Sequence, residues 1–591
     1  MSVKLYINDK QVEAIEGQTI LEAAKDNGVY IPTLCYHKDL CVAGNCRVCL
    51  VEVEGSRTLL ASCTTPVAPQ MKVKTHSPVA VKARKTAMEL LLAEHVGDCY
   101  TCARNFDCEL QQIAYEMGVV DLPFEKRKEP KWEKDFTTAI IRDNDKCILC
   151  TRCVRTCEEL QKVEALKSVG KGHFTHIGTF FEEGLGGIAC TLCGQCVNRC
   201  PTGALFENSP IDQVWEALED PTKYVVVQTA PAIRASIGEE FGLPAGTRVT
   251  GQLVAALRKL GFDHVGDTDF TADLTILEEG TEFLTRIKRK FVDGEDVALP
   301  MLTSCSPGWI KYIEHFFPEE LDHLSTCKSP QQMFGALAKT YYANKIGKKP
   351  EDVVVVSIMP CTAKKYEANR PEMRDSGVQD VDYVLTTREL AKMIKQAGYD
   401  LKTLEQEEFD NPFGITTGAG VIFGATGGVM EAALRTVYEV VTGREVPFER
   451  LRIEPVRGLD GVKEAAVTIE GAVEDWKFLE GVTVKVAVAH GLANAFKVMQ
   501  LVREGKADYH FIEVMACPGG CIGGGGQPRP TTEEIRAARI RAIYEEDENM
   551  KLRKSHENPI VETLYKEFLE KPNSHKSHEL LHTHYTPRER Y

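Results

Sequence analysis

The cysteines of this chain are grouped as metal ligands are. There are 21 of them among 591 residues. The start of the sequence lacks a signal-peptide core, so we expect a cytoplasmic protein whose thiols stay reduced. The group Cys517-Pro-Gly-Gly-Cys521 is followed by a glycine run, which lets backbone approach a bound object without Cβ clashes. For this segment alone, a glycine-rich turn with two structural cysteines is the alternative.

Residues 1–78 are predicted to form a 2Fe-2S ferredoxin-like domain. Strands at 4–8 and 48–53 around a helix at 19–27 suit that small fold, and four thiolates can hold two irons. The spacing resembles that of the 2Fe-2S domain of complex I and its hydrogenase relatives. Structural zinc is the alternative, although zinc sites usually show two Cys-x2-Cys pairs. We interpret Cys41 as spare. The predicted ligands are Cys35, Cys46, Cys49 and Cys63.

Residues 79–137 are predicted to begin with a helix at 79–94 and to carry one His and three Cys on a compact loop. Zinc would accept this ligand set equally well. A lone zinc site between two ferredoxins would have no evident role, however, and the motif resembles the His-ligated 4Fe-4S site of complex I and of hydrogenases. A neutral imidazole in place of a thiolate should change the reduction potential of the cluster. The predicted ligands are His95, Cys99, Cys102 and Cys108.

Residues 138–209 contain an internal repeat. The pattern Cys-x2-Cys-x2-Cys-x3-Cys occurs twice, and Pro201 follows the second copy. This is the pattern of bacterial two-cluster ferredoxins, in which the fourth cysteine of each run binds the other cluster. One predicted 4Fe-4S cluster therefore has Cys147, Cys150, Cys153 and Cys200 as ligands. The other has Cys190, Cys193, Cys196 and Cys157.

Residues 210–530 alternate between short apolar strands and helices, which predicts an α/β domain with mainly parallel sheets. Buried strands are expected at 224–228, 300–303, 353–358, 482–489 and 509–514, and helices include 250–260 and 330–344. Three of these strands end in segments that contain Cys305, Cys361 and Cys517. Open α/β sheets bind ligands beyond the carboxyl ends of their strands, so the three segments can meet in one crevice.

Residues 531–591 are rich in charged residues, and helices are predicted at 531–550 and 559–569. The end of this segment holds several histidines. An exposed polar tail is the favoured interpretation, with a metal-binding tract as the alternative. These histidines are His575, His578, His582 and His584.

The composition excludes some classes of protein. The hydrophobic content of 43% and charged content of 27% are those of a globular protein. We expect no membrane-spanning segment, because no apolar run approaches the necessary length. A net charge of -15 argues against nucleic acid as a partner.

The segments around Cys305, Cys361 and Cys517 resemble the three signature motifs of the FeFe (iron-only) hydrogenases, and the upstream domains resemble those of multi-cluster members. The resemblance covers nearly the whole chain, and residues 531–591 resemble the hydrogenase small subunit. It implies ferredoxin-like iron–sulfur domains followed by a two-lobed α/β catalytic domain. It also implies the H-cluster, which joins a 4Fe-4S cube to a two-iron unit with CO, cyanide and a dithiolate. By this resemblance Cys361, Cys517 and Cys521 bind the cube, and Cys521 is the bridge.

The resemblance implies roles for further residues around the two-iron unit. Lys364 should donate a hydrogen bond to one cyanide, as ammonium groups do to anions. The backbone at Ala230-Pro231-Ala232 should cradle the other cyanide. Met359 and Met515 should form a soft apolar wall.

The first motif departs from the common pattern of two adjacent cysteines, because this chain has Cys305 followed by Ser306. Strict position would make Ser306 the cube ligand and Cys305 the proton relay. A cube prefers thiolates, so we favour Cys305 as the ligand, with Ser306 near the relay. Cys327 is a remote third option.

The family's reaction is the reversible formation of H2 from two protons and two electrons, so protons and electrons need separate routes. Buried carboxylates with raised pKa values would suit proton passage, with solvated helix carboxylates as the alternative. The family's relay corresponds here to Glu279, Glu282, Ser325 and Arg286.

The sequence lacks a glycine-rich dinucleotide fingerprint beside a strand. We therefore expect electrons to pass through four accessory clusters to partner subunits that carry flavin and NAD(P)H, to ferredoxin, or to both. The alternatives are an electron-relay subunit like those of complex I and formate dehydrogenase, which shares only the first 200 residues, and an H2-sensing homologue.

Overall fold

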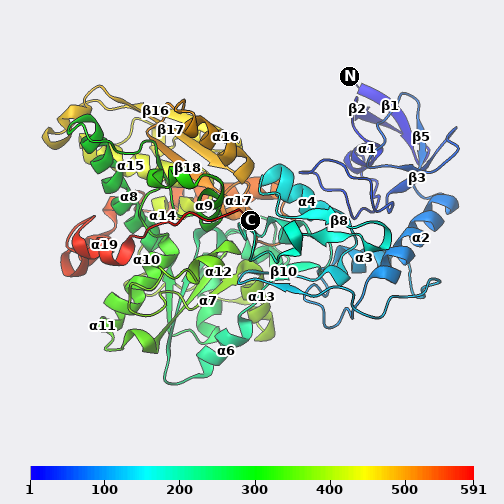
Figure 1. The fold of residues 1–591 in the computed structure, drawn as a ribbon, viewed down its shortest axis with the longest axis horizontal. Helices are drawn as coiled ribbons and strands as arrows, with labels where there is room; N and C mark the ends of the chain where they lie inside the picture. The colour runs from blue at the N-terminus through cyan, green and yellow to red at the C-terminus, as the bar shows by residue number, and fades with distance from the viewer. Residues whose placement is uncertain (1, 591) are drawn as a thin grey trace. The chain divides into compact units, whose positions relative to one another are not determined.

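The structure is a computed structural model that describes residues 2–590. It divides into two compact units. The first contains the chain up to residue 159 together with 164–188 and 199–206. The second contains 160–163, 189–198 and the chain from 207 onward. Figure 1 follows the chain from blue at the N-terminus to red at the C-terminus.

The first unit begins with the expected small ferredoxin-like fold. A five-stranded sheet in the order β2-β1-β5-β3-β4 packs against α1 (Ile20–Asp26), whose buried face is apolar. A capping box between Thr19 and Glu22 fixes the start of this helix. The strands are β1 (Ser2–Ile7), β2 (Lys10–Ile15), β3 (Leu50–Val53), β4 (Leu60–Ala61) and β5 (Lys72–Lys74).

The remainder of the first unit is made of short elements between the cysteine groups. Helix α2 begins at Pro78, where Ser77 caps the helix and proline suits the first turn. The elements are α2 (Pro78–Glu94), α3 (Glu109–Glu116), β6 (Asp135–Phe136), β7 (Ile140–Arg142), α4 (Arg152–Arg155), β8 (Lys167–Val169), β9 (His176–Gly178) and β10 (Leu205–Glu207).

The second unit contains two four-stranded sheets, each with its own apolar core. The first sheet has the order β12-β11-β14-β15, and all its strands are parallel. Strand β14 is buried throughout its length, as expected for a parallel strand covered on both faces. The strands are β11 (Tyr224–Thr229), β12 (His264–Asp267), β14 (Val353–Met359) and β15 (Tyr383–Thr386).

The second sheet has the order β13-β18-β17-β16. The β13-β18 and β18-β17 pairs are parallel, and β16 is an antiparallel edge. Helices α15 and α16 lie beside this sheet (Figure 1). The strands are β13 (Met301–Leu302), β16 (Val462–Thr468), β17 (Thr483–His490) and β18 (Phe511–Met515). The two lobes with mainly parallel sheets are as the sequence predicted.

Helix α8 (Thr268–Phe291) packs against α10 of one lobe and α15 of the other. It is therefore buried between the two lobes. The other helices of the second unit include α6 (Ile211–Glu219), α7 (Thr250–Leu260), α9 (Pro307–Phe316), α10 (Pro330–Leu337), α11 (Ala343–Lys345), α12 (Ala363–Ala368), α13 (Thr387–Gln396), α14 (Gly418–Val421), α15 (Gly428–Thr442), α16 (Leu492–Arg503), α17 (Glu533–Asn549), α18 (Pro559–Leu564) and α19 (His575–Leu581). Helix α5 is Gln195–Arg199.

Three sequence predictions need correction. The strand at 300–303 is only two residues long, and it begins after Pro300, which has no N–H to donate. The helix at 330–344 is divided by a π-helical turn, Ala338–Tyr342. The C-terminal histidines are not a simple exposed tail: α19 packs on the core through Leu580 and Leu581, and His582 is buried. In residues 2–590, we find no helix with the length and apolar character required to cross a bilayer.

Candidate active site

Strand ends from both lobes deliver cysteines to one cavity of about 80 Å³. Cys305 follows β13, Cys361 follows β14, and Cys517 and Cys521 follow β18. These strands end at the carboxyl edges of the two sheets, where an open α/β fold places its ligand sites. The predicted convergence of the three motifs is therefore present in the structure. Other lining residues include Thr268, Ala272, Pro307, Pro330, Gln331, Phe423 and Gly524.

The thiols of Cys361 and Cys517 are in hydrogen-bond contact. This contact lowers the pKa of Cys361 and raises the pKa of Cys517. Burial raises the pKa of Cys521 to about 12, and the nearby Cys361 contributes to that rise. Soft thiols so close together in a buried space suit an iron–sulfur cube, which takes thiolate ligands.

The glycines between and behind the last two cysteines are required by close backbone contacts. Gly520 has a positive φ of 87°, which disfavours other residues. A Cβ on Gly524 would lie 2.1 Å from the Pro360 oxygen, so only glycine fits there. The loop can thus bring Cys521 beside the cavity while its backbone touches the segment that carries Cys361.

Lys364 lies at the cavity wall with its ammonium group held in place. Its Nζ donates to the backbone oxygen of Cys305 at 3.1 Å and to Glu367 Oε2 at 2.9 Å. Glu367 in turn accepts hydrogen bonds from Ser329 at 2.9 Å and from Gln331 at 3.0 Å. The sequence interpretation missed Glu367 and Gln331, because an isolated polar residue on a helix does not reveal its partners.

Most of the other predicted pocket residues line the same cavity. Ala230, Pro231, Met359 and Met515 do so, whereas Ala232 is fully buried beside them. Ser306 also lines the cavity, and its Oγ accepts a hydrogen bond from the Ala516 N–H at 3.2 Å. The Cys305 thiol has a raised pKa, first because of burial and then because of the nearby Glu279 carboxylate.

The four predicted relay residues form a contiguous path leading away from Cys305. Burial raises the pKa of Glu279 to about 8, while its hydrogen-bond contact with Ser325 opposes that shift. The Ser325 hydroxyl also donates to Glu282 Oε2 at 3.0 Å. Arg286 Nη2 donates to Glu282 Oε1 at 2.7 Å. Arg286 and Glu282 line an open hollow, so the path leads from the cavity that Cys305 lines to the surface.

Glu513 is a buried carboxylate that the sequence interpretation also missed. It lies inside the apolar strand β18, two residues before Met515, and accepts hydrogen bonds from Gly427 N and Met430 N at 2.7 Å each. The start of α15 therefore satisfies this carboxylate and ties the helix to the strand that carries Cys517. A charged residue inside an apolar strand was the available signal.

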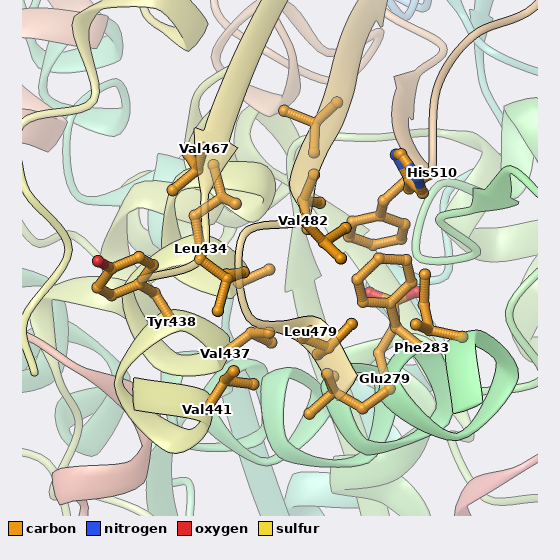
Figure 2. Close-up of a pocket in the computed structure, with 18 of the residues that line it drawn as sticks. Glu279, Phe283, Leu434, Val437, Tyr438, Val441, Val467, Leu479, Val482 and His510 are labelled. Atoms are coloured by element: carbon orange, nitrogen blue, oxygen red, sulfur yellow. The ribbon is translucent and has the colours of Figure 1, made fainter. Parts of the chain in front are cut away.

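A second, larger cavity lies beside Glu279. It has a volume of about 250 Å³ and is lined almost entirely by apolar side chains. Figure 2 shows Phe283 and Glu279 on α8, Leu434, Val437 and Val441 on α15, and Val482 around this space. The apolar walls are expected to keep the cavity dry, which explains why Glu279 is so strongly desolvated.

The second ferredoxin run packs against the active-site loop within the second unit. Cys193 interacts electrostatically with Cys361 and Cys517. Gln195 Nε2 donates to the Gly523 oxygen at 2.9 Å, and Asn198 Nδ2 donates to the Gly524 oxygen at 2.8 Å. A cluster held by Cys190, Cys193 and Cys196 would therefore lie next to the cavity. Cys157, the predicted fourth ligand, belongs to the first unit.

In the first unit, the predicted 2Fe-2S ligands come together. Cys49 Sγ and Cys63 Sγ are 3.4 Å apart, and Cys35 contacts both Cys46 and Cys63. Cys41 instead is exposed, and its thiol donates to Glu159 Oε1 at 2.6 Å. These contacts fit a four-thiolate cluster from which Cys41 is excluded.

The predicted 4Fe-4S ligands of the first unit also lie close together. His95, Cys99, Cys102 and Cys108 line one small cavity, and among the described residues His95 Nδ1 is buried without a hydrogen-bond partner. Burial lowers the pKa of His95 to about 4, so its imidazole is neutral. A neutral ring with an unpaired buried nitrogen suits ligation of a metal.

The first ferredoxin run is likewise gathered in the first unit. Cys147 and Cys150 both interact with Cys200, the predicted fourth ligand of their cluster. Cys153 is buried within the same run, on α4. This arrangement fits the crossed ligand pattern of a two-cluster ferredoxin.

Comparison with known families assigns a domain to most of the chain. Residues 223–525 match the C-terminal domain of the iron-only hydrogenase large subunit, and residues 533–588 match the iron hydrogenase small subunit. Residues 1–78 match a 2Fe-2S binding domain. Residues 84–122 match the iron–sulfur binding region of NADH-ubiquinone oxidoreductase G, and residues 138–206 match the ferredoxin-like domain of NADH-quinone oxidoreductase subunit 3.

Relatives cover the chain from end to end. It is 51% identical to the NADP-reducing hydrogenase subunit HndD of Solidesulfovibrio fructosivorans, over 99% of each chain. It is 40% identical to iron hydrogenase 1 of Clostridium pasteurianum, over 98% of this chain and 99% of that protein. The apo FeFe hydrogenase HydA1 of Chlamydomonas reinhardtii superposes with a TM-score of 0.58 at 45% identity, over 64% of this chain and all of that one. The catalytic-domain match favours a hydrogenase over a relay subunit that shares only the first 200 residues, and the chain belongs to the FeFe hydrogenases as a catalytic subunit with N-terminal iron–sulfur domains.

Proposed function

We propose that Cys361, Cys517 and Cys521 hold the 4Fe-4S cube of an H-cluster and that Cys521 bridges the cube to the two-iron unit. The observation that carries this assignment is the thiol contact between Cys361 and Cys517 beside Cys521, since Cys361 follows a strand of one sheet and the other two follow a strand of the second sheet. When bound, the H-cluster supplies a Lewis-acidic iron and a basic amine for splitting H2. The protein has to hold that cluster, exclude water and move protons.

Cys305 completes the thiolate set in this proposal. It is the only thiol of its segment, lines the same cavity and interacts with Cys521. Ser306 then has a different task, since its hydroxyl fixes the Ala516 N–H just before Cys517. Loss of the cube signal in electron paramagnetic resonance (EPR) spectra of Cys305→Ala, but not of Ser306→Ala, supports this division; the reverse result makes Ser306 the ligand.

The cavity walls hold the diatomic ligands of the two-iron unit. Lys364 would donate to one cyanide of the bound cluster, because its ammonium group lies at the wall with Glu367 and the Cys305 carbonyl as anchors. The backbone at Ala230-Pro231-Ala232 would cradle the other cyanide, and Met359 and Met515 would provide the apolar wall. The thioether side chains are apolar and polarisable, so they would help to keep water away from the bound cluster.

Protons enter and leave along Glu279, Ser325 and Glu282, and Arg286 is the fourth member of the relay, bonded to Glu282. Each member contacts the next, and the last two reach an open hollow. A carboxyl group with a pKa of about 8, as burial gives Glu279, can both accept and return a proton near neutral pH. Arg286 fixes the orientation of Glu282 instead of carrying the proton itself, because guanidinium stays protonated.

Electrons pass through four accessory clusters. One is a 2Fe-2S cluster in residues 1–78, one is the His95-ligated 4Fe-4S cluster in residues 79–137, and two are the 4Fe-4S clusters in residues 138–209. The catalytic domain spans residues 210–530, and residues 531–591 form the small-subunit-like segment. The cluster of Cys190, Cys193 and Cys196 is the last before the cube, since Cys193 interacts with two cube ligands.

The electron partners are subunits that bind flavin and NAD(P), soluble ferredoxin, or both, and the enzyme works in the cytoplasm. The support for a nicotinamide-linked partner subunit is the 51% identity to a subunit of an NADP-reducing hydrogenase. The sequence itself offers no dinucleotide fingerprint beside a strand.

Exchange between D2 and H2O tests the active site without any electron partner. Anaerobically matured protein should release HD and H2 from D2, because heterolytic splitting followed by proton exchange needs only the cavity and the relay. Absence of HD from protein whose H-cluster is complete by infrared spectroscopy would contradict the proposal.

A further inference from the structure

A compact group of three metal-ligand side chains lies beside the proposed proton route. Glu282, Cys327 and His582 are buried, and one ligand atom from each lies within 4.8 Å of the other two. They come from α8, from the segment before α10, and from the residues after α19. The Cys327 Sγ and Glu282 Oε2 atoms are 3.8 Å apart.

These separations are close to those of a zinc site. Zinc binds thiolate at about 2.3 Å and imidazole or carboxylate at about 2.0–2.2 Å in a tetrahedral arrangement. Those bond lengths place neighbouring ligand atoms about 3.3–3.7 Å apart. Side-chain movements of less than about 1 Å would therefore convert the present arrangement into a three-ligand site with room for a water.

The imidazole of His582 is held in one orientation by a carboxylate and a hydroxyl. Histidine ligands in zinc proteins are commonly held in the same way. His582 Nε2 faces Glu278 Oε2 at 3.3 Å, and Nδ1 contacts the Thr326 hydroxyl at 2.8 Å. Glu278 is itself fixed by hydrogen bonds from Tyr565 and Ser577. Because Glu278 holds Nε2, Nδ1 is the nitrogen that would bind the metal, and it would exchange its contact with the Thr326 hydroxyl for that bond.

Charge and access also fit a divalent cation. A carboxylate, a thiolate and a neutral imidazole together neutralise a charge of two. In the present structure Arg286 balances the Glu282 charge, so the cation must compete with that ion pair. Glu282 and Thr326 line the open hollow, which gives a path from solvent.

We propose that Glu282, Cys327 and His582 form a binding site for a soft divalent cation of the zinc class. Bound metal would occupy the carboxylate that passes protons between Ser325 and the surface, and would inhibit turnover reversibly. The predicted inhibition rests on the proposed proton route, whereas the proposed metal site does not depend on that route.

Equilibrium dialysis of the holoenzyme against zinc chloride, with zinc absorption spectroscopy, tests the site. We expect one high-affinity zinc with a single sulfur neighbour at about 2.3 Å. Cys327→Ala should lose that sulfur, and both Cys327→Ala and His582→Gln should bind at least about tenfold more weakly. His584→Gln, whose imidazole is exposed, is the matched control and should bind as the wild type does. Unchanged affinity and an unchanged zinc spectrum in Cys327→Ala would overturn the proposal.

Zinc inhibition, normalised to the zinc-free rate of each variant, separates the two parts of the argument. Inhibition that follows occupancy, is reversed by a chelator and weakens in Cys327→Ala supports both the site and the proton route. Zinc that binds with the expected spectrum but leaves the rate unchanged keeps the metal site and contradicts the role of Glu282 in proton transfer.

Discussion

The Lys364 ammonium and the Glu367 carboxylate are 2.9 Å apart at the cavity wall, and both side chains are buried. Ser329 and Gln331 supply two further hydrogen bonds to Glu367, so this carboxylate holds Lys364 in one orientation. A buried ammonium group fixed in this way directs its remaining N–H donor to one position in the cavity. Glu367 is therefore a positioning residue for Lys364.

Glu367→Gln should lower H2 turnover by about tenfold to 100-fold, because the neutral amide no longer fixes the Lys364 donor. The cyanide stretching bands of matured protein should shift as well, which loss of stability alone would not cause. Glu372→Gln, next to Arg370 and outside the cavity lining, is the control. Unchanged infrared bands in Glu367→Gln would remove this residue from the account.

Glu279→Gln should lower turnover by about 100-fold or more while EPR signals of all clusters remain, because the amide cannot pass a proton. Glu278→Gln is the matched control, since it is the neighbouring buried carboxylate on α8 but faces Tyr565 and Ser577. Equal losses of rate in the two variants would indicate a structural effect on α8 and would count against the relay.

Acid should weaken the active-site loop through His490. Burial lowers the pKa of His490 from 6.5 to about 4, and its Nδ1 accepts the Gly519 N–H at 3.0 Å. Because the folded pKa lies below the ordinary value, this stabilisation is complete above pH 6.5 and is lost as pH falls toward 4.

The measurement for His490 is anaerobic unfolding between pH 7.5 and 5.5. Below pH 6.5, His490→Gln should remove about 1.4 kcal/mol per pH unit from the slope of unfolding free energy. His575→Gln, with an exposed imidazole, should keep the wild-type slope. A wild-type slope in His490→Gln would show that this histidine is not held neutral.

His95→Ala should lose one 4Fe-4S signal from the EPR spectrum and the corresponding iron, because it removes one of four ligands. Cys41→Ser is the matched variant in the same unit and should lose none, since Cys41 is exposed and bonded to Glu159. A full set of cluster signals in His95→Ala would contradict ligation by this histidine.

The spacing of the metal ligands and the apolar pattern of the strands were sufficient to predict most of the fold and most of the candidate cluster ligands. Cysteines three residues apart can converge on one cluster whatever surrounds them, and the β-branched apolar run of β14 is typical of a buried parallel strand. The partners of single polar residues were not predictable. Glu367, Glu513 and His582 acquire their roles from residues distant in sequence, and periodicity carries no information about such contacts. The same limit explains why the C-terminal histidines were interpreted as an exposed tail.

The central claim is that Cys361, Cys517 and Cys521 hold one centre at which H2 is formed. The direct measurement is H2 evolution from reduced viologen by anaerobically matured protein, beside Cys521→Ala prepared in the same way. The account predicts sustained H2 production by the wild type and only background gas from Cys521→Ala, whose accessory clusters stay intact. Equal gas production by the two proteins would contradict the assignment of the active site.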